Sequence, residues 1–302
     1  MKDTVAIAIT KLSKRYGNAP KLALSNLSLE VHRGEVYGFL GANGAGKSTT
    51  IRTLLNFIQP SKGSATIVGH DSVRDAVAIK KHIGYLAGEV ALYQQMTGKQ
   101  FLSFMEQLQP LKHAAYRTDL VRRFRAELTK PIGTLSKGNR QKLGIIQAFM
   151  HEPDVLILDE PTSGLDPLMQ EEFFAVVREA QERGASVFVS SHNFAEVQRM
   201  CSRVGFIREG KLVAERSLAE LADQAAHTFT LTFAREVPLA ELKKLPRSKI
   251  TPLGTHHATI TTRGQLSPLF AILAKHTVTR MQQQEINLEQ EFLRFYEKGG
   301  TK

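Results

Sequence analysis

Residues 41–49 read GANGAGKST, a segment that matches the pattern G-x-x-x-x-G-K-[ST] and follows the apolar run Val36–Leu40. The glycines of this pattern let a backbone adopt positive φ and approach an anion closely. Lys47 then reaches terminal phosphates, and the Ser48 hydroxyl is placed to bind Mg²⁺. The apolar run predicts a buried strand and residues 47–55 predict a helix, whose N-terminus favours negative charge. We therefore expect a strand, a phosphate-binding loop and a helix, rather than a glycine-rich turn without a ligand.

The composition is ordinary for a soluble globular protein. The chain has 302 residues, of which 42% are apolar and 23% charged, and this allows one large or two medium domains. Its single cysteine, Cys201, excludes an intramolecular disulfide framework and suits a reducing compartment. We expect Cys201 to be a small buried side chain. No run approaches the roughly 18 apolar residues of a membrane span, and no signal peptide is expected at the N-terminus. Any role at a membrane must therefore come through a partner.

Strands and helices are expected to alternate along most of the chain. After a β-rich start and the phosphate-binding loop come further strands, a helical stretch and a second series of strand–helix pairs. Expected strands lie at residues 5–12, 23–31, 35–40, 64–68, 83–86, 155–158, 186–190, 203–207 and 211–214, and expected helices at 140–150, 167–183 and 194–200. Strands that alternate with helices favour a mostly parallel sheet, so the fold class is α/β.

Between Thr97 and about residue 128 the apolar spacing becomes that of helices. Thr97 and Gln100 have the spacing of a capping box, and an apolar stripe follows them. The second helix of this stretch carries basic residues largely outside its apolar side, namely Arg117, Arg122, Arg123 and Arg125. Two interpretations remain for them: a solvated basic face, or a surface that meets anionic lipid headgroups or an acidic loop of a partner.

Beyond residue 217 the character of the chain changes. Expected strands at 228–233, 250–253, 258–262 and 278–282 alternate with expected helices at 239–244 and 268–274, and an amphipathic helix at 288–296 follows. The order β-α-β-β-α-β permits a small ferredoxin-like accessory domain. This α+β domain is expected to cover residues 223–302.

Two acidic residues, Asp159 and Glu160, end the apolar run at 155–158. A strand buried on both faces can deliver Asp159 beside the phosphate-binding loop, where it would hold Mg²⁺ through water, and Glu160 would then orient an attacking water. The alternative is a solvated acidic turn. Upstream, LSKGN at 135–139 precedes the expected helix at 140–150 and offers the Ser136 hydroxyl and backbone N–H groups to a phosphate, or forms a simple N-cap.

In their order along the chain these motifs resemble those of the ATP-binding subunits of ABC transporters. GANGAGKST resembles the Walker A loop of that family, VLILDE its Walker B strand, and LSKGN stands where the family usually shows LSGGQ. SGLD at 163–166 resembles the D-loop, Ser191-His192 the switch histidine, and Tyr16 the ring that stacks on adenine. The resemblance covers residue 4 to about residue 222. It implies a P-loop ATPase cassette at 1–222 with a RecA-like core, an antiparallel β subdomain and a helical subdomain at about 92–150.

The resemblance also implies the ligands, ATP and Mg²⁺, and the role of each site residue. Glu160 would be the general base or water-orienting group, and His192 would contact the γ-phosphate and the attacking water. Ser48 and Asp159 would hold Mg²⁺. The residues implied in nucleotide binding are Tyr16, Gly41, Asn43, Gly44, Ala45, Gly46, Lys47, Ser48, Thr49, Ser136, Gly138, Asn139 and Asp166.

The same resemblance implies two kinds of partner. Ser136 and Gly138 would act in trans on ATP held by a second cassette, so a head-to-tail homodimer or heterodimer is expected, which closes on ATP and opens after hydrolysis. A transmembrane permease on a separate chain would receive the resulting motion, with this subunit cytoplasmic and peripheral on the cytoplasmic face of the cell membrane. Residues 215–220 and 288–296 resemble the tail of exporter cassettes, so export is the expected direction.

Two positions depart from the family pattern. Gly88 stands where the family shows a glutamine that senses Mg²⁺ and links the site to the permease, so coupling would use Glu89 or backbone groups instead. Lys137 and Asn139 replace a glycine and a glutamine in the LSGGQ motif, which alters the ribose-side contact. Both variants resemble those of cassettes that pair with separate exporter-type permeases.

The net charge of +11 and the pI near 9.7 keep a second function class open. A soluble ATPase of this family could act on nucleic acid or ribosomes. Against that alternative, the chain has no coiled-coil insertion between Lys47 and Ser136, no cysteine pairs and a single cassette, so no direct nucleic-acid contact is expected. A regulator that senses nucleotide without hydrolysis is disfavoured because both Glu160 and His192 are present.

Overall fold

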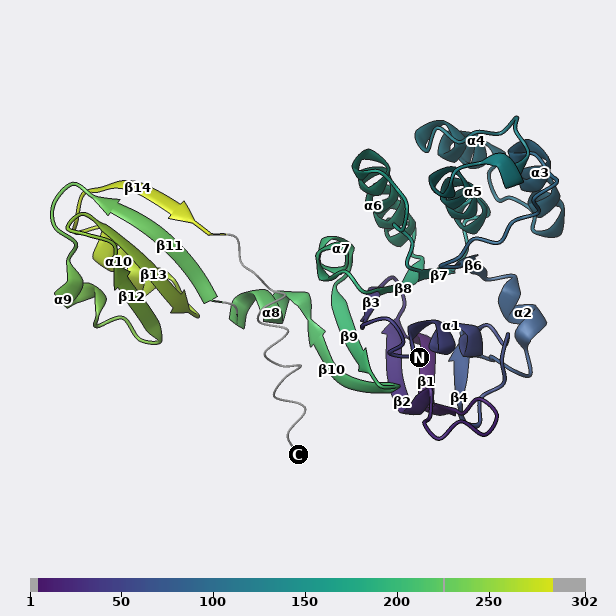
Figure 1. Cartoon of the computed structure of the whole chain (residues 1–302), viewed down its shortest axis with the longest axis horizontal. Coiled ribbons are helices and arrows are strands. Elements are labelled where there is room, and N and C mark those ends of the chain that lie inside the picture. The colour runs from purple at the N-terminus through teal and green to yellow at the C-terminus, as the bar shows by residue number, and fades with distance from the viewer. Residues whose placement is uncertain (1–4, 225, 285–302) are drawn as a thin grey trace. The chain divides into compact units, whose positions relative to one another are not determined.

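A computed structural model describes residues 5–224 and 226–284 (Figure 1), and the helix expected at 288–296 lies outside this described part. The chain divides into two compact units, Met1–Glu215 and Arg216–Lys302. This division falls earlier than the boundary expected after residue 222.

The first unit is built around a six-stranded sheet with the order β10-β9-β3-β8-β7-β6. Its members are β3 (Val36–Leu40), β6 (Ile83–Leu86), β7 (Val155–Asp159), β8 (Ser186–Ser191), β9 (Arg203–Arg208) and β10 (Lys211–Ser217). The pairs from β9 across to β6 are parallel, as the alternation of strands and helices predicts. Strands β3, β7 and β8 are buried along their whole length, which explains the apolar runs Val36–Leu40 of β3, Val155–Leu158 of β7 and Val187–Val189 of β8.

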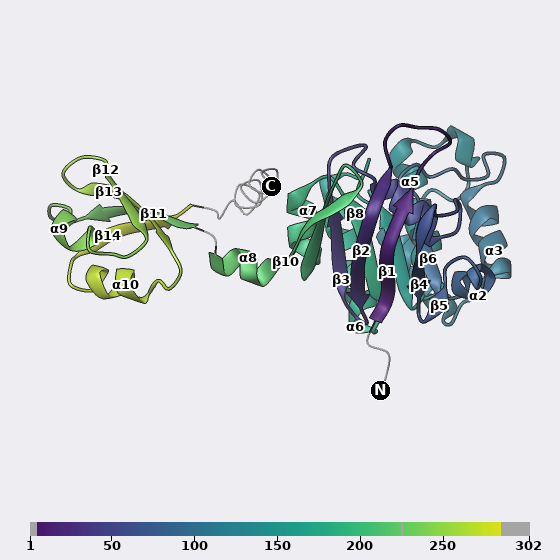
Figure 2. The ribbon, with the colours of Figure 1, turned by 90° about the horizontal axis from the view of Figure 1, so that it is seen from below.

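A second, antiparallel sheet with the order β2-β1-β4-β5 lies beside the first (Figure 2). It consists of β1 (Val5–Lys14), β2 (Leu24–His32), β4 (Lys62–Ile67) and β5 (His70–Asp71). Helix α1 (Lys47–Leu54) packs against β4 of this sheet and β7 of the central sheet. Buried apolar side chains of both sheets and of α1, such as Ile7, Ile51 and Phe188, form one continuous core.

Helices cover the other face of the central sheet. Helix α6 (Pro167–Glu182) packs on β8, and α7 (Phe194–Met200) packs on β3 and β8. Farther along lie α3 (Gly98–Leu108), α4 (Ala114–Arg123), the 3₁₀ turn Ile132–Thr134 and α5 (Lys137–Phe149), which group together in Figure 1. The capping box expected at Thr97 and Gln100 is confirmed. A short helix α2 (Ala76–Lys80) was not expected, because five residues are too few to show a periodic pattern.

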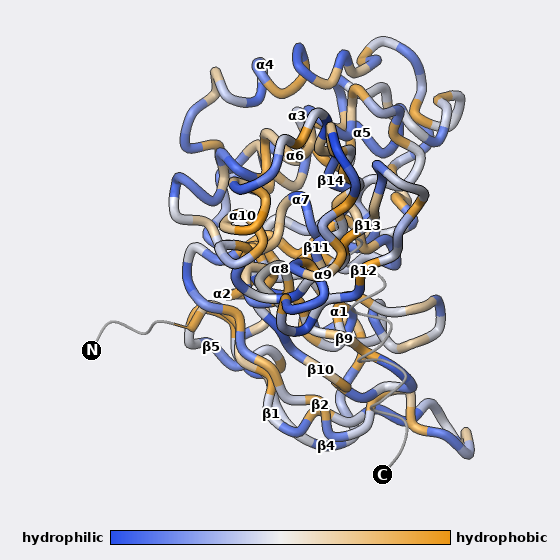
Figure 3. Tube along the Cα trace, turned by 90° about the vertical axis from the view of Figure 1, so that its left-hand side faces the viewer, coloured by the Kyte–Doolittle hydropathy of each residue, from blue (hydrophilic) through white to orange (hydrophobic). Residues whose placement is uncertain are grey.

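The arginines of α4 are bound to acidic side chains of the same unit. Arg123 is 15% exposed and donates to Glu172 and Glu179 of α6, with two contacts of 2.7 Å to the Glu179 carboxylate. The hydrogen bonds that this guanidinium donates to Glu179 raise its pKa above its usual range. Arg117 pairs with Glu106. In Figure 3, hydrophilic (blue) and hydrophobic (orange) segments alternate along α4. Arg123 therefore joins α4 to α6 and is not part of a solvated basic face.

The single cysteine faces the core. A Cβ built on Gly38 of β3 would lie 3.1 Å from the Cys201 sulfur, and burial raises the pKa of this thiol well above its usual range. We expect Cys201 to react slowly with a disulfide reagent in the native protein at pH 8, and about 100-fold faster in denaturant, because the thiolate is the reactive form. The measurement is the labelling rate by absorbance, and rapid labelling of the native protein would contradict this placement.

The second unit begins with α8 (Leu218–Gln224) and has the expected order β-α-β-β-α-β. Its elements are β11 (Ala226–Phe233), α9 (Leu239–Leu242), β12 (Ser248–Pro252), β13 (His257–Arg263), α10 (Ser267–Leu273) and β14 (Val278–Gln283). The strands form one antiparallel sheet with the order β12-β13-β11-β14. Phe229, Leu231 and Ile260 of the sheet pack on Leu269 of α10, so this unit has a core of its own.

Candidate nucleotide-binding and hydrolysis site

The glycine-rich loop leads from β3 into α1. Gly46 occupies the N-cap of α1 with a φ of 116°, and Gly44 has a φ of 80°. A Cβ built on Gly41 would lie 2.5 Å from the Ile207 carbonyl oxygen, and one on Gly46 would lie 2.9 Å from that of Ala23. Because backbone lies too close for a side chain and the dihedrals favour glycine, the loop requires these residues.

Lys47 lies at the centre of this loop with only 6% of its side chain exposed. Its ammonium donates to the carbonyl oxygens of Gly41, at 2.7 Å, and Ala42, at 3.3 Å. The same nitrogen lies 3.2 Å from Oε1 of Glu160. A buried cation held this way, at the N-terminus of a helix, provides a preformed site for an anionic group.

A cleft of about 220 Å³ opens over the loop. It is lined by Ala23, Asn43, Gly44, Gly46, Lys47, Ser48, Thr49 and Glu160. Six of the expected loop residues thus share one cavity with the Glu160 carboxylate, whereas Gly41 and Ala45 do not line it. Ala23 was not expected here, since nothing in its sequence context distinguishes it from any other residue that leads into a strand.

Glu160 follows β7 and has a φ of 47°, in the left-handed region that residues other than glycine seldom adopt. Its N–H donates to the Ser190 carbonyl oxygen at 3.1 Å, and its Oε2 lies 2.7 Å from Nδ1 of His192. Oε1 is buried and makes an ion pair with Lys47, but no donor in the described residues meets it in hydrogen-bond geometry. This buried oxygen thus faces the Lys47 ammonium, and unusual backbone dihedrals such as that of Glu160 cluster at functional sites.

Asp159 is held beside Glu160 by the neighbouring strand. Its Oδ1 accepts a hydrogen bond from the Ser190 hydroxyl, and the residue itself is 6% exposed. A Cβ built on Gly88 would lie 3.4 Å from Oδ2 of Asp159. Gly88, which stands where the family shows a glutamine, therefore lies beside this carboxylate. Burial, and then the charge of Asp159, raise the pKa of Tyr85 to about 12. Ser190 was not expected, although a serine at the end of an apolar strand is a signal for such a contact.

The three catalytic motifs meet because they follow three neighbouring strands. The order β3-β8-β7 brings the loop after β3, His192 after β8 and Glu160 after β7 to one edge of the sheet. Ligands of open α/β sheets bind at this carboxyl edge. His192 is 59% exposed and Glu160 22%, so the pair is open to solvent on the histidine side.

Tyr16 lies at the side of this site. Its ring is 44% exposed, and its hydroxyl lies 3.4 Å from that of Thr49 in α1. The Lys14 ammonium lies 5.4 Å from the ring centre. The exposed ring next to α1 can therefore stack on a planar group bound at the loop.

The remaining expected residues do not line the cleft. Ser136 caps α5 by accepting from the Asn139 N–H at 3.2 Å, and Asp166 caps α6 by accepting from the Met169 N–H at 3.0 Å. The cap at Ser136 also explains why α5 begins at Lys137, earlier than the expected residue 140. A single copy of the chain thus uses these side chains as helix caps.

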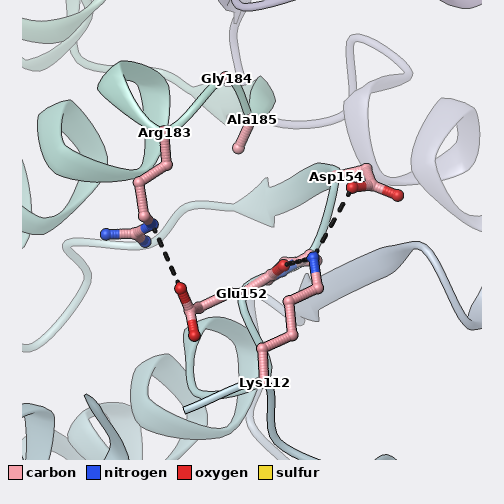
Figure 4. Close-up of a pocket in the computed structure, with 7 residues that line it drawn as sticks. Lys112, Glu152, Asp154, Arg183, Gly184 and Ala185 are labelled. Carbon is pink, nitrogen blue, oxygen red and sulfur yellow. Dashed lines mark hydrogen bonds and ion pairs between the residues drawn. The ribbon is translucent and has the colours of Figure 1, made fainter.

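A different cleft of about 330 Å³ lies where β7 and β8 begin (Figure 4). The Lys112 ammonium donates to the Glu152 carbonyl oxygen at 2.7 Å and lies 3.9 Å from Asp154, and Arg183 lies 3.8 Å from the Glu152 carboxylate. The charged side chains drawn there are paired with one another. This cleft, at the amino ends of the strands, lacks the arrangement that phosphates require.

Comparison with known proteins places this site in a family. Residues 24–163 match the ABC transporter family. NatA of Bacillus subtilis (strain 168), an ABC transporter ATP-binding protein, is 35% identical over 223 residues, which cover 71% of this chain and 91% of that protein. The bacitracin transport ATP-binding protein BcrA of Bacillus licheniformis is 37% identical over 69% of each chain. The linearmycin resistance ATP-binding protein LnrL of Bacillus subtilis (strain 168) is 29% identical over 93% of this chain and 95% of its own length.

Solved structures agree with this assignment. The structure of an ABC transporter ATP-binding subunit aligns with a TM-score of 0.67 and 29% identity, covering 72% of this chain and 91% of that chain. A dimeric ATP-binding cassette in a post-hydrolysis state with ADP and Pi has the same fold, with a TM-score of 0.64 and 20% identity over 70% of this chain and 98% of its own. The chain therefore belongs to the ABC transporter family, as one of its ATP-binding and ATP-hydrolysing subunits.

Proposed function

We propose that this subunit powers export through a transmembrane permease carried on a separate chain. The names of two similar proteins, for bacitracin transport and linearmycin resistance, support a role in moving a compound out of the cell. Among residues 5–224 and 226–284, the structure has no helix long and apolar enough to cross a membrane. The subunit would lie on the cytoplasmic face of the cell membrane, bound to its permease. The comparisons offer no support for the alternative of a nucleic-acid ATPase.

The observation that carries the ATP-hydrolysing part of this proposal is the chain of contacts from Lys47 through Glu160 to His192. Lys47 and the amides of the loop would bind the β- and γ-phosphates, and Tyr16 would stack on adenine. Glu160 would accept a proton from the attacking water at its carboxylate. Because a carboxylate oxygen can only accept, Nδ1 of His192 would donate to Oε2. Nε2 would then accept from the water in the neutral ring, or donate to the γ-phosphate in the protonated ring.

The donors present fit Mg²⁺. Ser48 lines the cleft, and Asp159 offers a carboxylate directly before Glu160, which also lines it. Mg²⁺ usually takes one or two carboxylates and completes its shell with water and substrate phosphates. Mg²⁺, when bound, would neutralise phosphate charge, and Ser48 and Asp159 would orient it.

A pair of cassettes would form the working unit, as in the dimeric cassette with the same fold. Ser136, Gly138 and Asn139, which do not line the cleft of their own chain, would then contact ATP held by the second copy, either identical or a paralogue. Asp166 would lie at the same interface. The second unit of the chain, with its sheet order β12-β13-β11-β14, would be a ferredoxin-like accessory domain.

Co-purification tests this function. Tagged Glu160→Gln protein, expressed in its source cell and given ATP, is expected to stay with the membrane fraction in high salt, since salt removes only loose electrostatic binding. A polytopic membrane protein should then elute with it after detergent extraction, whereas the same preparation without ATP serves as the control. Recovery in the soluble fraction with RNA, DNA or ribosomes would contradict the proposal.

A further inference from the structure

Helix α5, which begins within the LSKGN motif, contacts the loop after β7 at three places. The Gln141 side chain, only 2% exposed, donates to the Pro161 carbonyl oxygen at 2.7 Å. A Cβ built on Gly138 would lie 2.7 Å from the Gly164 carbonyl oxygen, so backbone meets backbone there. Lys137 adds a third contact, from its ammonium to the Ser163 hydroxyl at 2.9 Å. The N-terminal turn of α5 and residues 160–164 therefore form one packed assembly.

The loop held by α5 carries the carboxylate of the hydrolysis site. The Ser163 N–H donates to the Glu160 carbonyl oxygen at 3.2 Å, which closes a tight turn between them. Glu160 itself has its positive φ at the start of this turn. A displacement of Ser163 would therefore shift the backbone of Glu160, and this backbone sets the direction of the Glu160 carboxylate.

Lys137 is the member of this assembly that departs from the family pattern, since a glycine at its position could make no such contact. A cation at the first residue of a helix opposes the positive end of the helix dipole, and the first turn of α5 has no acidic residue to balance it. Lys137 also borders an open cleft of about 370 Å³ that includes Glu89, yet its ammonium bonds to Ser163 instead. Its methylene groups lie within 3.5 Å of a Cβ built on Gly164, so the whole side chain follows the loop.

We propose that Lys137 is a positioning residue that couples the two ATP sites of the cassette dimer through Ser163. This inference rests on the proposed function, in which Ser136 and Gly138 contact the ATP of the second copy. When the turn that contains Lys137 closes on that ATP, its bond to Ser163 moves the loop that carries Glu160 of its own site. The buried hydrogen bond from Gln141 to Pro161 fixes the start of the loop to α5, and the hydrogen bond from Lys137 connects α5 to Ser163.

The test is a double-mutant cycle on the full-length chain with ATPase kinetics and ATP binding as readouts. Lys137→Met keeps the length of the side chain and removes the ammonium, and Ser163→Ala removes its acceptor. Each change is expected to lower kcat about five- to ten-fold, the scale of one typical net hydrogen bond. The affinity for labelled ATP should stay within about two-fold, and the double variant should lose no more than either single one, because both remove the same contact.

Two further readouts separate coupling from a merely structural effect. The Hill coefficient for ATP should fall from its wild-type value towards one in Lys137→Met, and Lys137→Arg, which retains a donor, should restore both kcat and cooperativity. Lys142→Met removes the same charge from the same helix and should change neither. Additive losses, an unchanged Hill coefficient or an equal loss in Lys142→Met would overturn the inference.

The failure of this inference is distinguishable from failure of the proposed function. A wild-type protein without ATPase activity would contradict the proposed site itself. An active wild-type protein whose Lys137→Met and Ser163→Ala variants have unchanged kinetics would contradict only the role of Lys137.

Discussion

Glu160→Gln is expected to lower the rate of ATP hydrolysis by about 10²–10⁴-fold, the usual cost of losing a general base, while ATP still binds. The amide keeps the shape of the side chain and an acceptor for His192 Nδ1, which lies 2.7 Å from Oε2. It cannot take a proton from water. It also removes the charge that now pairs with the Lys47 ammonium at 3.2 Å, which leaves that cation to the phosphates. ATP bound without turnover should therefore stabilise the closed dimer.

The measurements are phosphate release at saturating ATP and the oligomeric state by size-exclusion chromatography with light scattering. Glu182→Gln, which changes an exposed glutamate at the end of α6, is the matched control and should hydrolyse ATP at the wild-type rate. If Glu160→Gln retains wild-type turnover, Glu160 has no role in the chemistry. If it fails to bind labelled ATP, its role is structural instead.

Phe188→Ala is expected to remove about 3–5 kcal/mol from the free energy of unfolding of the first unit, a large share of the roughly 5–15 kcal/mol typical of a domain. Phe188 lies in β8, the strand between β3 and β7, and is fully buried. Its ring centre lies 5.9 Å from that of Tyr37 and 5.2 Å from that of Phe39. Truncation would leave a cavity in a fully buried part of the core, where the flanking strands β3 and β7 limit collapse.

Urea titration followed by circular dichroism measures this loss as a shift in the midpoint at constant slope. Val213→Ala, on the partly exposed strand β10, is the control, and surface changes of this kind usually stay within about 0.5 kcal/mol. Phe188→Leu should fall between the two, since it retains most of the volume. A loss below about 1 kcal/mol for Phe188→Ala would mean that the core refills the space.

Much of the fold followed from local patterns. The run Val155–Leu158 has the continuous apolar character of a strand buried on both faces, and the structure buries it completely. The capping box at Thr97 was readable because its two partners are three residues apart. The short helix α2 and the early start of α5 at Lys137 were missed, because a few residues at the end of an element carry little periodic signal.

Part of the candidate site could likewise be predicted from local sequence, and part could not. The sequence by itself determined the shape of the phosphate-binding loop, because Gly44 and Gly46 adopt positive φ and Gly41 has no room for a side chain. It also determined the order of the motifs, since each follows an element with its own local pattern. These signals need no knowledge of distant parts of the chain.

Only the tertiary structure decided which of these residues touch. Lys47, Glu160 and His192 are far apart in sequence and meet because β3, β8 and β7 are neighbours in the central sheet. The pairing of β7 with β8 brings the Ser190 hydroxyl within hydrogen-bond distance of Asp159. The packing of α5 on the loop after β7 does the same for the Lys137 ammonium and the Ser163 hydroxyl. Contacts of this kind depend on strand order and helix packing, which are set by the whole core and not by the residues that make the contact.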